Sequence, residues 1–387
     1  MSYELLNKLY YKDKDLFDSE YSARKSGAYS TSLNLDIHNH EAFFVNIPDF
    51  LTTTARIYKK FSDLNSLCKD LPKVAYNCYE RNCLIDEIIL TNDIEGIRST
   101  RKEVKDVLDN DSNSTKKKKF DGMIKKYALL LDDSYKVELN SSLDIRKLYN
   151  EIVYDEIEEK NWPDGEIFRK DVAEVISGTQ QVKHVGVIPE SKIIHYMDTM
   201  LYMLKDNNIP MLHKIAIFHY VIGYVHPFYD GNGRLSRFIS SYLLKEEFNS
   251  LVALRLSYTI KNSKSDYYKA FDIANDPHNM GDLTHFILYF SDVVEQSIDS
   301  LQERLSTGKE KLDFYASAIN KKFNGIDEKE QKKTSKVLWL LIQNQLFTND
   351  PFDRKSLANQ LGVSAETAHH YVEGLIKTGS PIFMISC

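Results

Sequence analysis

The sequence is short of cysteine, of excess positive charge and of long apolar runs. Only four of its 387 residues are cysteines, and none forms a CxxC pair or lies at a spacing to histidine that is typical of zinc sites. This pattern argues against a disulfide scaffold and indicates reduced thiols in a cytosolic protein. The net charge of -6 argues against a chain built mainly to coat nucleic acid.

Segments that would direct the chain to a membrane are also missing. The longest apolar stretch, residues 215–225, is too short for a bilayer, which takes about 20 residues to span. Residues 1–17 are polar and of mixed charge, so no signal peptide is expected. With 42% hydrophobic and 27% charged residues, we expect a soluble, globular, cytoplasmic protein of two or three domains, without a membrane partner.

The spacing of apolar residues predicts an all-α protein with one small β-hairpin. Apolar residues recur at intervals of three and four residues over 59–91, with a break at Pro72. The same helical pattern returns over 120–154. A further helix should run over 211–225. The β-branched segment 182–188, with glycines near it and a proline after it, predicts the hairpin.

We expect four segments along the chain. They are an N-terminal region over 1–119, a central core over 120–300, a helical linker over 301–335 and a C-terminal module over 336–387. The structure of the N-terminal region before about residue 58 is left open by its short apolar groups. The lysine-rich stretch 109–119 is interpreted as a solvated loop.

The C-terminal module resembles a helix-turn-helix or winged helix. A turn over 361–364 separates two helical segments, Ser364 is suited to cap the second, and 382–386 would start a wing. The candidate recognition helix, 364–377, carries one lysine and two glutamates, whereas reading the major groove usually takes Arg, Lys, Asn or Gln. A protein-contact or dimer-contact module is therefore favoured over DNA binding.

Residues 226–237 read HPFYDGNGRLSR and concentrate several chemically useful groups. Pro227 disfavours helix at His226, so the preceding helix should end there. Gly231 and Gly233 permit positive φ and a close approach by a ligand. The next helix should begin near 232–234, where its free N–H groups and dipole form an anion site.

The side chains of this segment complete a phosphate site beside a base. Arg234 and Arg237 lie three residues apart and off the helix's apolar stripe, so both can face one phosphate ligand. Asp230 offers a hard oxygen for Mg²⁺, and His226 is placed to accept a proton from a hydroxyl. His213 and His219, on the helix before the motif, are interpreted as structural.

These twelve residues match HPFxDGNGRxxR, and the chain resembles the Fic family over about 80–290. Residues 165–169, GEIFR, resemble the segment before the family's flap, and Ser257 with 267–270 resemble its later helices. The resemblance implies a helical core with a hairpin flap, and transfer of AMP from ATP to a Ser, Thr or Tyr hydroxyl of a target protein. ATP and Mg²⁺ are the implied substrate and cofactor.

The resemblance also implies a role for each motif residue. His226 would be the general base, Phe228 the loop's anchor and Asp230 the Mg²⁺ ligand. Phosphate contacts would come from Gly231, Asn232, Gly233, Arg234 and Arg237, with Arg234 near the β-phosphate and Arg237 on the γ-phosphate. The flap would grip the target's main chain by strand addition, through Gly178, Val182, Lys183, His184 and Val185.

Residues 91–96, TNDIEG, match the family's inhibitory motif (S/T)xxxE(G/N). Leu84, Ile88, Thr91 and Glu95 share one helix face, so Glu95 should point inward, where a carboxylate needs a cation. The resemblance names Arg237 as that cation and implies an intramolecular brake on a helix N-terminal to the core, over about 80–97. The alternative is a helix end capped by Gly96, with Glu95 in solvent.

Other functions stay open. Doc-type relatives, which phosphorylate, have lysine at the second glycine of the motif, so Gly233 favours AMP transfer; phosphocholine transfer remains an alternative. Auto-AMPylation, removal of AMP from the target and homodimers are also compatible with the resemblance. A transcription regulator with a degenerate nucleotide site is the rival class, against which the intact motif argues.

Overall fold

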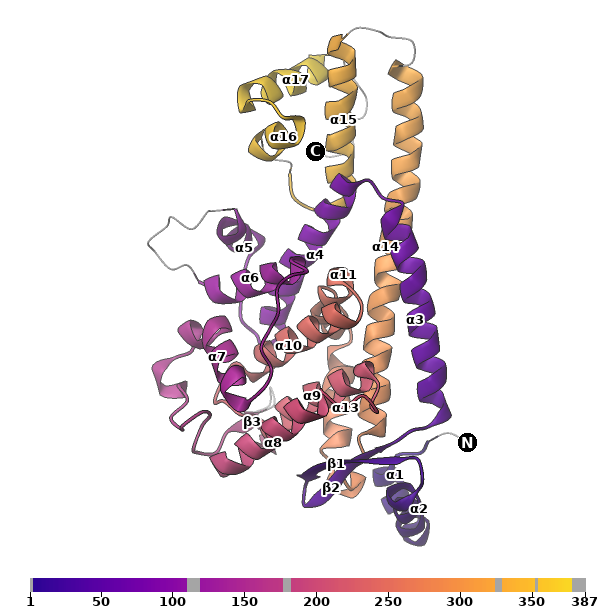
Figure 1. The fold of residues 1–387 in the computed structure, drawn as a ribbon, viewed down its shortest axis with the longest axis vertical. Helices are drawn as coiled ribbons and strands as arrows, with labels where there is room; N and C mark the ends of the chain where they lie inside the picture. The colour runs from indigo at the N-terminus through magenta and orange to yellow at the C-terminus, as the bar shows by residue number, and fades with distance from the viewer. Residues whose placement is uncertain (1–2, 110–118, 177–181, 324–328, 352–353, 378–387) are drawn as a thin grey trace. The chain divides into compact units, whose positions relative to one another are not determined.

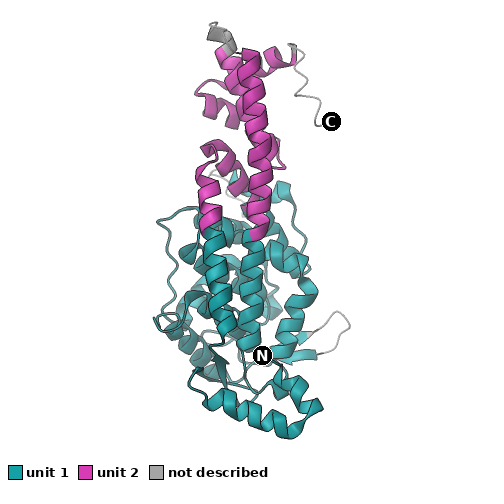
Figure 2. Ribbon diagram, turned by 90° about the vertical axis from the view of Figure 1, so that its right-hand side faces the viewer, with its two compact units in different colours: residues 1–61, 84–298 teal, residues 62–83, 299–387 magenta. Residues whose placement is uncertain are grey.

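The computed structural model describes residues 3–109, 119–176, 182–323, 329–351 and 354–377 (Figure 1). These residues are mainly helical, with two separate two-stranded antiparallel sheets. The predicted all-α class with a small hairpin is therefore confirmed. Two compact units are distinguished, one of residues 1–61 and 84–298 and the other of 62–83 and 299–387 (Figure 2). The four segments expected from the sequence stay a prediction.

The first unit contains the predicted hairpin and the helices that surround it. Its elements are α1 (Leu6–Lys12), α2 (Lys14–Ser26), β1 (Ser30–Ile37), β2 (His40–Val45), α5 (Arg101–Leu108), α6 (Asp121–Ala128), α7 (Ser142–Ile152), β3 (Glu174–Ile176), β4 (Val182–Val185), α8 (Glu190–Met203), α9 (Met211–Val225), α10 (Asn232–Glu247), α11 (Ser250–Ala253), α12 (Leu256–Asn262) and α13 (Lys264–Ala274). Short 3₁₀ turns are Leu129–Leu131, Tyr154–Glu156, Glu159–Asn161 and Pro277–Asn279. Helices α3 (Pro48–Lys69), α4 (Lys73–Ile94) and α14 (Thr284–Phe323) contribute residues to both units.

Helix α9 is the core of the first unit. Thirteen of its fifteen residues are buried, as expected for a helix that is apolar on all sides. Helices α8 and α10 pack against it, and a Cβ on Gly223 would lie 2.5 Å from the Phe271 ring, so α13 also approaches closely. The helix ends at Val225, as predicted, and His226 turns the chain in the left-handed conformation with φ 52°.

An N-terminal hairpin is present that the sequence interpretation left open. Strand β1 alternates, with Leu33, Leu35 and Ile37 buried and their neighbours mostly exposed, which is the pattern of a half-buried strand. His38 and Asn39 both have positive φ in the tight turn to β2. The hairpin is attached to the core through hydrogen bonds to the Tyr196 and Tyr224 hydroxyls.

The second unit carries the predicted pair of short helices. Helix α17 (Ala365–Lys377) packs on α16 (Arg354–Leu361) and α15 (Lys329–Phe347). The Ser364 hydroxyl accepts from the Thr367 amide at 3.1 Å, so the predicted N-cap is confirmed. The expected wing strand, 382–386, lies outside the described residues, as does most of the lysine-rich stretch. The winged-helix assignment therefore stays a prediction.

The described residues bear on the cysteines and on the absence of a membrane span, two points that the sequence raised. Cys68 and Cys78 are free thiols, and Cys387 lies outside the described residues. No described helix combines the length and the apolar character needed to cross a bilayer.

The burial of His213 should make the stability of the protein sensitive to acid. It is 2% exposed, packs between Phe44 and Phe50, and neither ring nitrogen has a hydrogen-bond partner among the described residues. Burial lowers its pKa to about 4, so the unfolded state takes up a proton that the folded state resists as pH falls below about 6.5.

The free energy of unfolding of the parent should fall between pH 7 and pH 5. In His213→Phe this fall should be smaller by about 2 kcal/mol, because phenylalanine takes up no proton. Urea unfolding at the two pH values measures this difference. The same loss in the variant and in the parent would show that His213 does not titrate in this way.

Candidate functional site

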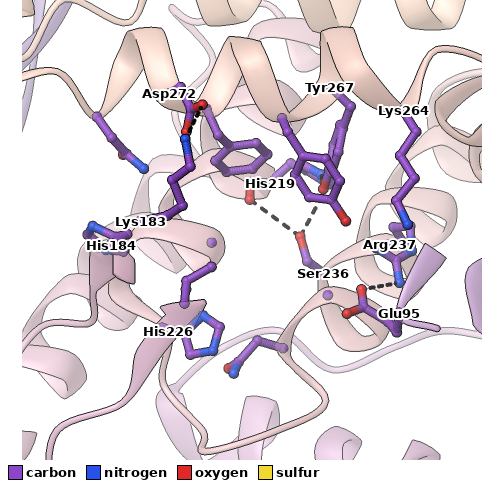
Figure 3. Close-up of a pocket in the computed structure, with 17 residues that line it drawn as sticks. Glu95, Lys183, His184, His219, His226, Ser236, Arg237, Lys264, Tyr267 and Asp272 are labelled. Atoms are coloured by element: carbon purple, nitrogen blue, oxygen red, sulfur yellow. Dashed lines mark hydrogen bonds and ion pairs between the residues drawn. The ribbon is translucent and has the colours of Figure 1, made fainter. Parts of the chain in front are cut away.

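A cavity of about 630 Å³ lies in the first unit, beside the sequence motif (Figure 3). One wall is the start of α10, and the opposite wall is α13. The end of α4, the hairpin β3–β4 and the last turns of α9 complete the lining. The lining residues are Glu95, Val175, Lys183, His184, His219, Gly223, His226, Asn232, Gly233, Ser236, Arg237, Lys264, Tyr267, Tyr268, Phe271, Asp272 and Asn275.

His226 is held at the cavity by its own backbone. Arg169, which is fully buried, donates from Nε to the His226 carbonyl at 2.7 Å and from Nη2 to the Val187 and Val225 carbonyls at 3.0 and 3.1 Å. Its Nη1 donates to the Asp171 carbonyl. One guanidinium therefore joins the end of α9 to the segment that follows β4, and this fixes the position of His226.

The loop after His226 is closed by Asn232 and anchored by Phe228. The Asn232 side chain accepts from the Phe228 amide at 2.9 Å and donates to the Phe228 carbonyl at 2.7 Å. The Phe228 ring is buried and stacks on Tyr149 with centroids 3.7 Å apart. The anchor expected at Phe228 is thus present, and the Asn232 amide closes the loop.

The start of α10 has the geometry of an anion site. Gly231 has φ 82°, and the first N–H groups of the helix cannot find acceptors within it. A Cβ on Gly233 would lie 2.0 Å from Glu95 Oε1, so this glycine allows α4 and α10 to approach. Gly233 itself lies within α10 and is not among the glycines with positive φ.

Asp230 is compatible with a single-carboxylate Mg²⁺ site. Its side chain is exposed, and Oδ1 accepts from the Gly231 amide at 2.5 Å. A hard cation held by one carboxylate, waters and phosphate oxygens needs no further protein ligand. Among the described residues no group of three or more His, Cys, Asp or Glu side chains could hold a metal ion by itself.

Arg237 is bound by the end of α4. It is 1% exposed, and it donates to the Thr91 hydroxyl at 2.7 Å, to the Thr91 carbonyl at 2.9 Å and to Glu95 Oε1 at 2.7 Å. Burial alone would raise the pKa of Glu95, but Arg237 lowers it below its ordinary value. The structure therefore brings together the residues that the predicted inhibitory motif named.

The end of α4 is itself well defined. Gly96, with φ 74°, and Ile97 donate back to the Asp93 and Asn92 carbonyls, which is a Schellman motif with Glu95 as the last half-helical residue. Glu95 thus lies at a helix end capped by Gly96, as the alternative interpretation expected, and it also pairs with Arg237. Its side chain keeps 35% exposure, and it faces the cavity.

Arg234 does not lie where a phosphate ligand was expected. It is 1% exposed and does not line the cavity, and Nη1 donates to Glu156 Oε2 at 2.7 Å. Its Nε has no hydrogen-bond partner among the described residues. Burial raises the pKa of Glu156 even though Arg234 acts in the opposite direction. The structure therefore does not bring Arg234 and Arg237 to one cavity, and the phosphate role of Arg234 stays a prediction.

The hairpin is fixed on two sides. His184 donates from Nε2 to the Tyr224 carbonyl at 2.5 Å, and Lys183 pairs with Asp272 of α13 at 3.2 Å. Val182 and Val185 are about half exposed. Of the residues expected in the flap, Gly178 lies outside the described residues.

The electrostatic setting of His226 favours the neutral imidazole. Burial, Arg169 and His184 lower its pKa to about 4, whereas the Glu95 carboxylate acts to raise it. The imidazole is therefore neutral near pH 7 and able to accept a proton. His219, with a pKa lowered by burial to about 3, is held by Ser240 and Tyr267, which agrees with a structural role.

Sequence reasoning missed three residues of this region. Arg169 lies in the GEIFR segment, but a buried arginine that binds carbonyls has no sequence pattern of its own. Glu156 lies in an acidic stretch where no spacing singles it out. Lys264 begins α13 and lines the cavity, and its position just before the tyrosine pair 267–268 was the available signal.

Fold and site together define a helical domain in which a glycine loop opens a helix beside a histidine-lined cavity. The model of the Fic/DOC family matches residues 140–244, which run from the start of α7 to α10. The chain therefore contains a Fic domain.

Relatives with assigned names match the same part of the chain. The "Protein adenylyltransferase Fic" of Drosophila erecta is 32% identical over 99 residues, which is 25% of this chain and 18% of that protein. Its counterpart in Drosophila virilis is 30% identical over 106 residues, or 27% of this chain and 20% of that protein. The chain thus matches about a fifth of these relatives' length.

A solved structure extends the likeness in fold. The Fic family protein from Desulfovibrio desulfuricans G20 has a TM-score of 0.53 to this chain and 18% sequence identity. The alignment covers 84% of this chain and 88% of that one. At this identity the likeness concerns the fold alone.

Arg169 should stabilise the protein through its hydrogen bonds to main-chain carbonyls, and another positively charged side chain should not replace it. Arg169→Lys keeps the charge but cannot reach the separate carbonyls, and we expect it to lower the free energy of unfolding by about 2–4 kcal/mol. Arg146→Lys is the control, because Arg146 donates to one main-chain carbonyl, that of Ile167, and should lose less. Urea unfolding compares the two, and equal losses would contradict the assignment.

The His226 imidazole should titrate well below its ordinary range. Histidine NMR should give a midpoint near pH 4 in the parent, as the lowered pKa implies. Glu95→Gln should lower the midpoint further, because it removes a carboxylate that favours the imidazolium. A midpoint near 6.5, or an upward shift in the variant, would show that burial and Glu95 do not act on His226 in this way.

Proposed function

We propose that this chain is an autoinhibited protein adenylyltransferase, which transfers AMP from ATP to a hydroxyl of a target protein. The observation that carries the proposal is the cavity in which a neutral His226 faces the first turn of α10 and Arg237. The names of the relatives that match the Fic domain support the same activity.

In this proposal the reaction follows from the positions of the groups. The target's hydroxyl oxygen attacks the α-phosphorus, its proton passes to the neutral His226 ring, and pyrophosphate leaves as the bond to the bridging oxygen breaks. The N–H groups at the start of α10 stabilise the charge on the phosphates. Mg²⁺, held by Asp230 and phosphate oxygens, would neutralise further charge when bound. The hairpin would hold the target's main chain.

Autoinhibition is proposed from the partner that Arg237 already has. A guanidinium that donates to Thr91 and Glu95 has little capacity left for a γ-phosphate. The negative charge of Glu95 also lies at the same end of the cavity, where it would repel phosphate. The identity of the target protein, the formation of a homodimer and the removal of AMP stay open.

Labelling with α-³²P-ATP tests the activity. Glu95→Gly should raise incorporation about tenfold or more, because it frees Arg237, and His226→Ala in that background should lower incorporation by about 100-fold or more. His195→Ala is the control, since His195 is exposed on α8 and does not line the cavity.

The position of the label decides between reaction types. Incorporation from α-labelled but not from γ-labelled ATP is expected for AMP transfer. Label from γ-³²P-ATP alone would indicate phosphoryl transfer, and no label on the Glu95→Gly protein or on any lysate protein would contradict the proposed function.

A further inference from the structure

Three cations line the cavity, and they differ in how their charge is balanced. Lys183 pairs with Asp272 at 3.2 Å, and Arg237 pairs with Glu95 at 2.7 Å. Lys264 donates instead to a neutral group, the Ile94 carbonyl, at 2.8 Å. In the part of the chain that the structure describes, no carboxylate pairs with Lys264. Its ammonium is therefore an unbalanced positive charge at the cavity wall.

Lys264 also lies at the end of the cavity where the brake is found. It is the first residue of α13, and it reaches to the last residue of α4, next to Glu95. Figure 3 shows its side chain extending from α13 toward Arg237 and Glu95. A cation on the last carbonyls of a helix stabilises that helix end, so the contact favours the position of α4 seen here.

A neighbouring lysine contacts the same helix end without facing the cavity. Lys261, one turn earlier on α12, pairs with Asp93, and it is not among the lining residues. Two lysines thus hold the end of α4, and only Lys264 could also meet a ligand in the cavity. The pair Lys261 and Lys264 therefore separates the two effects experimentally.

We propose that Lys264 is a second cation of the polyphosphate site, beside Arg237, with two alternative partners. While Glu95 occupies Arg237, Lys264 holds the Ile94 carbonyl. Once Glu95 has moved away, its ammonium binds the terminal phosphates of the nucleotide. The exchange is favourable because a hydrogen bond between two charged groups is stronger than one to a neutral carbonyl. The flexible stem of lysine permits the movement. This inference rests on the proposed nucleotide site and adds a residue that contacts both substrate and brake.

Nucleotide binding in the Glu95→Gly background tests the phosphate contact, because the brake's own contribution is absent there. Calorimetry with ATP and Mg²⁺ should show that Lys264→Gln weakens binding about tenfold, which corresponds to the loss of one charge-assisted hydrogen bond. Binding of AMP, which lacks the terminal phosphates, should change much less. Lys261→Gln should leave both affinities unchanged, and Lys264→Arg should restore part of the ATP affinity.

Equal ATP affinities of the Lys264→Gln and Lys261→Gln proteins would overturn the proposal, as would an equal loss for AMP and ATP. No ATP binding by the Glu95→Gly protein would overturn it together with the proposed function. If ATP binds with the expected Lys264 dependence but no AMP is transferred, the proposed function alone fails.

Hydrogen exchange tests the contact with α4 in the otherwise unchanged chain. Lys264→Gln and Lys261→Gln should both speed exchange of the amides over 92–97, because each removes one attachment of that helix end. Unchanged exchange in Lys264→Gln would show that Lys264 does not hold α4, and it would overturn the two-partner proposal.

Discussion

The burial of Arg237 is the constraint on which the arrangement of the site depends. A guanidinium that is 1% exposed is costly unless its donors and its charge are satisfied. In this structure α4 supplies the partners, namely a hydroxyl and a carbonyl from Thr91 and a carboxylate from Glu95. The place of α4, the closeness allowed by Gly233 and the charge at this end of the cavity all follow from that requirement.

The remaining contacts of α4 stabilise the same arrangement. Glu87, two turns before Glu95, is fully buried and accepts from the Ser257 amide and hydroxyl, with the hydroxyl at 2.6 Å. Lys261 and Lys264 hold the other end of the helix. In the proposed brake, a ligand that competes for Arg237 would compete with the contact that these attachments surround.

The opposite side of the cavity depends on a second buried arginine. Arg169 satisfies its donors with main-chain carbonyls, so it fixes backbone positions, and no carboxylate among the described residues forms an ion pair with it. The charge of Arg169 is one cause of the low pKa of His226. One arginine thus helps to position the proposed base and, after burial, to lower its pKa, while the other is the residue on which the proposed autoinhibition acts.

The sequence was informative where local chemistry is strong. Pro227 ended α9 where expected, the 226–237 segment opened a new helix, and the spacing of Thr91 and Glu95 placed both on the face that meets Arg237. It was less informative where a partner comes from far along the chain. Glu156 binds Arg234 from 78 residues away, and nothing local marks it. The alternation of Leu33, Leu35 and Ile37 is a signal for the N-terminal hairpin, but the strands are short and flanked by polar residues, so the signal is weak.

The central claim is that Glu95 and a nucleotide's terminal phosphate compete for Arg237. Crystal structures of the unchanged chain and of Glu95→Gly, each with a non-hydrolysable ATP analogue, test it most directly. The account predicts that only in the variant does Arg237 contact the γ-phosphate while the α-phosphate lies at the start of α10 beside His226. A γ-phosphate bound to Arg237 in the unchanged chain, with the Glu95 contact intact, would contradict it.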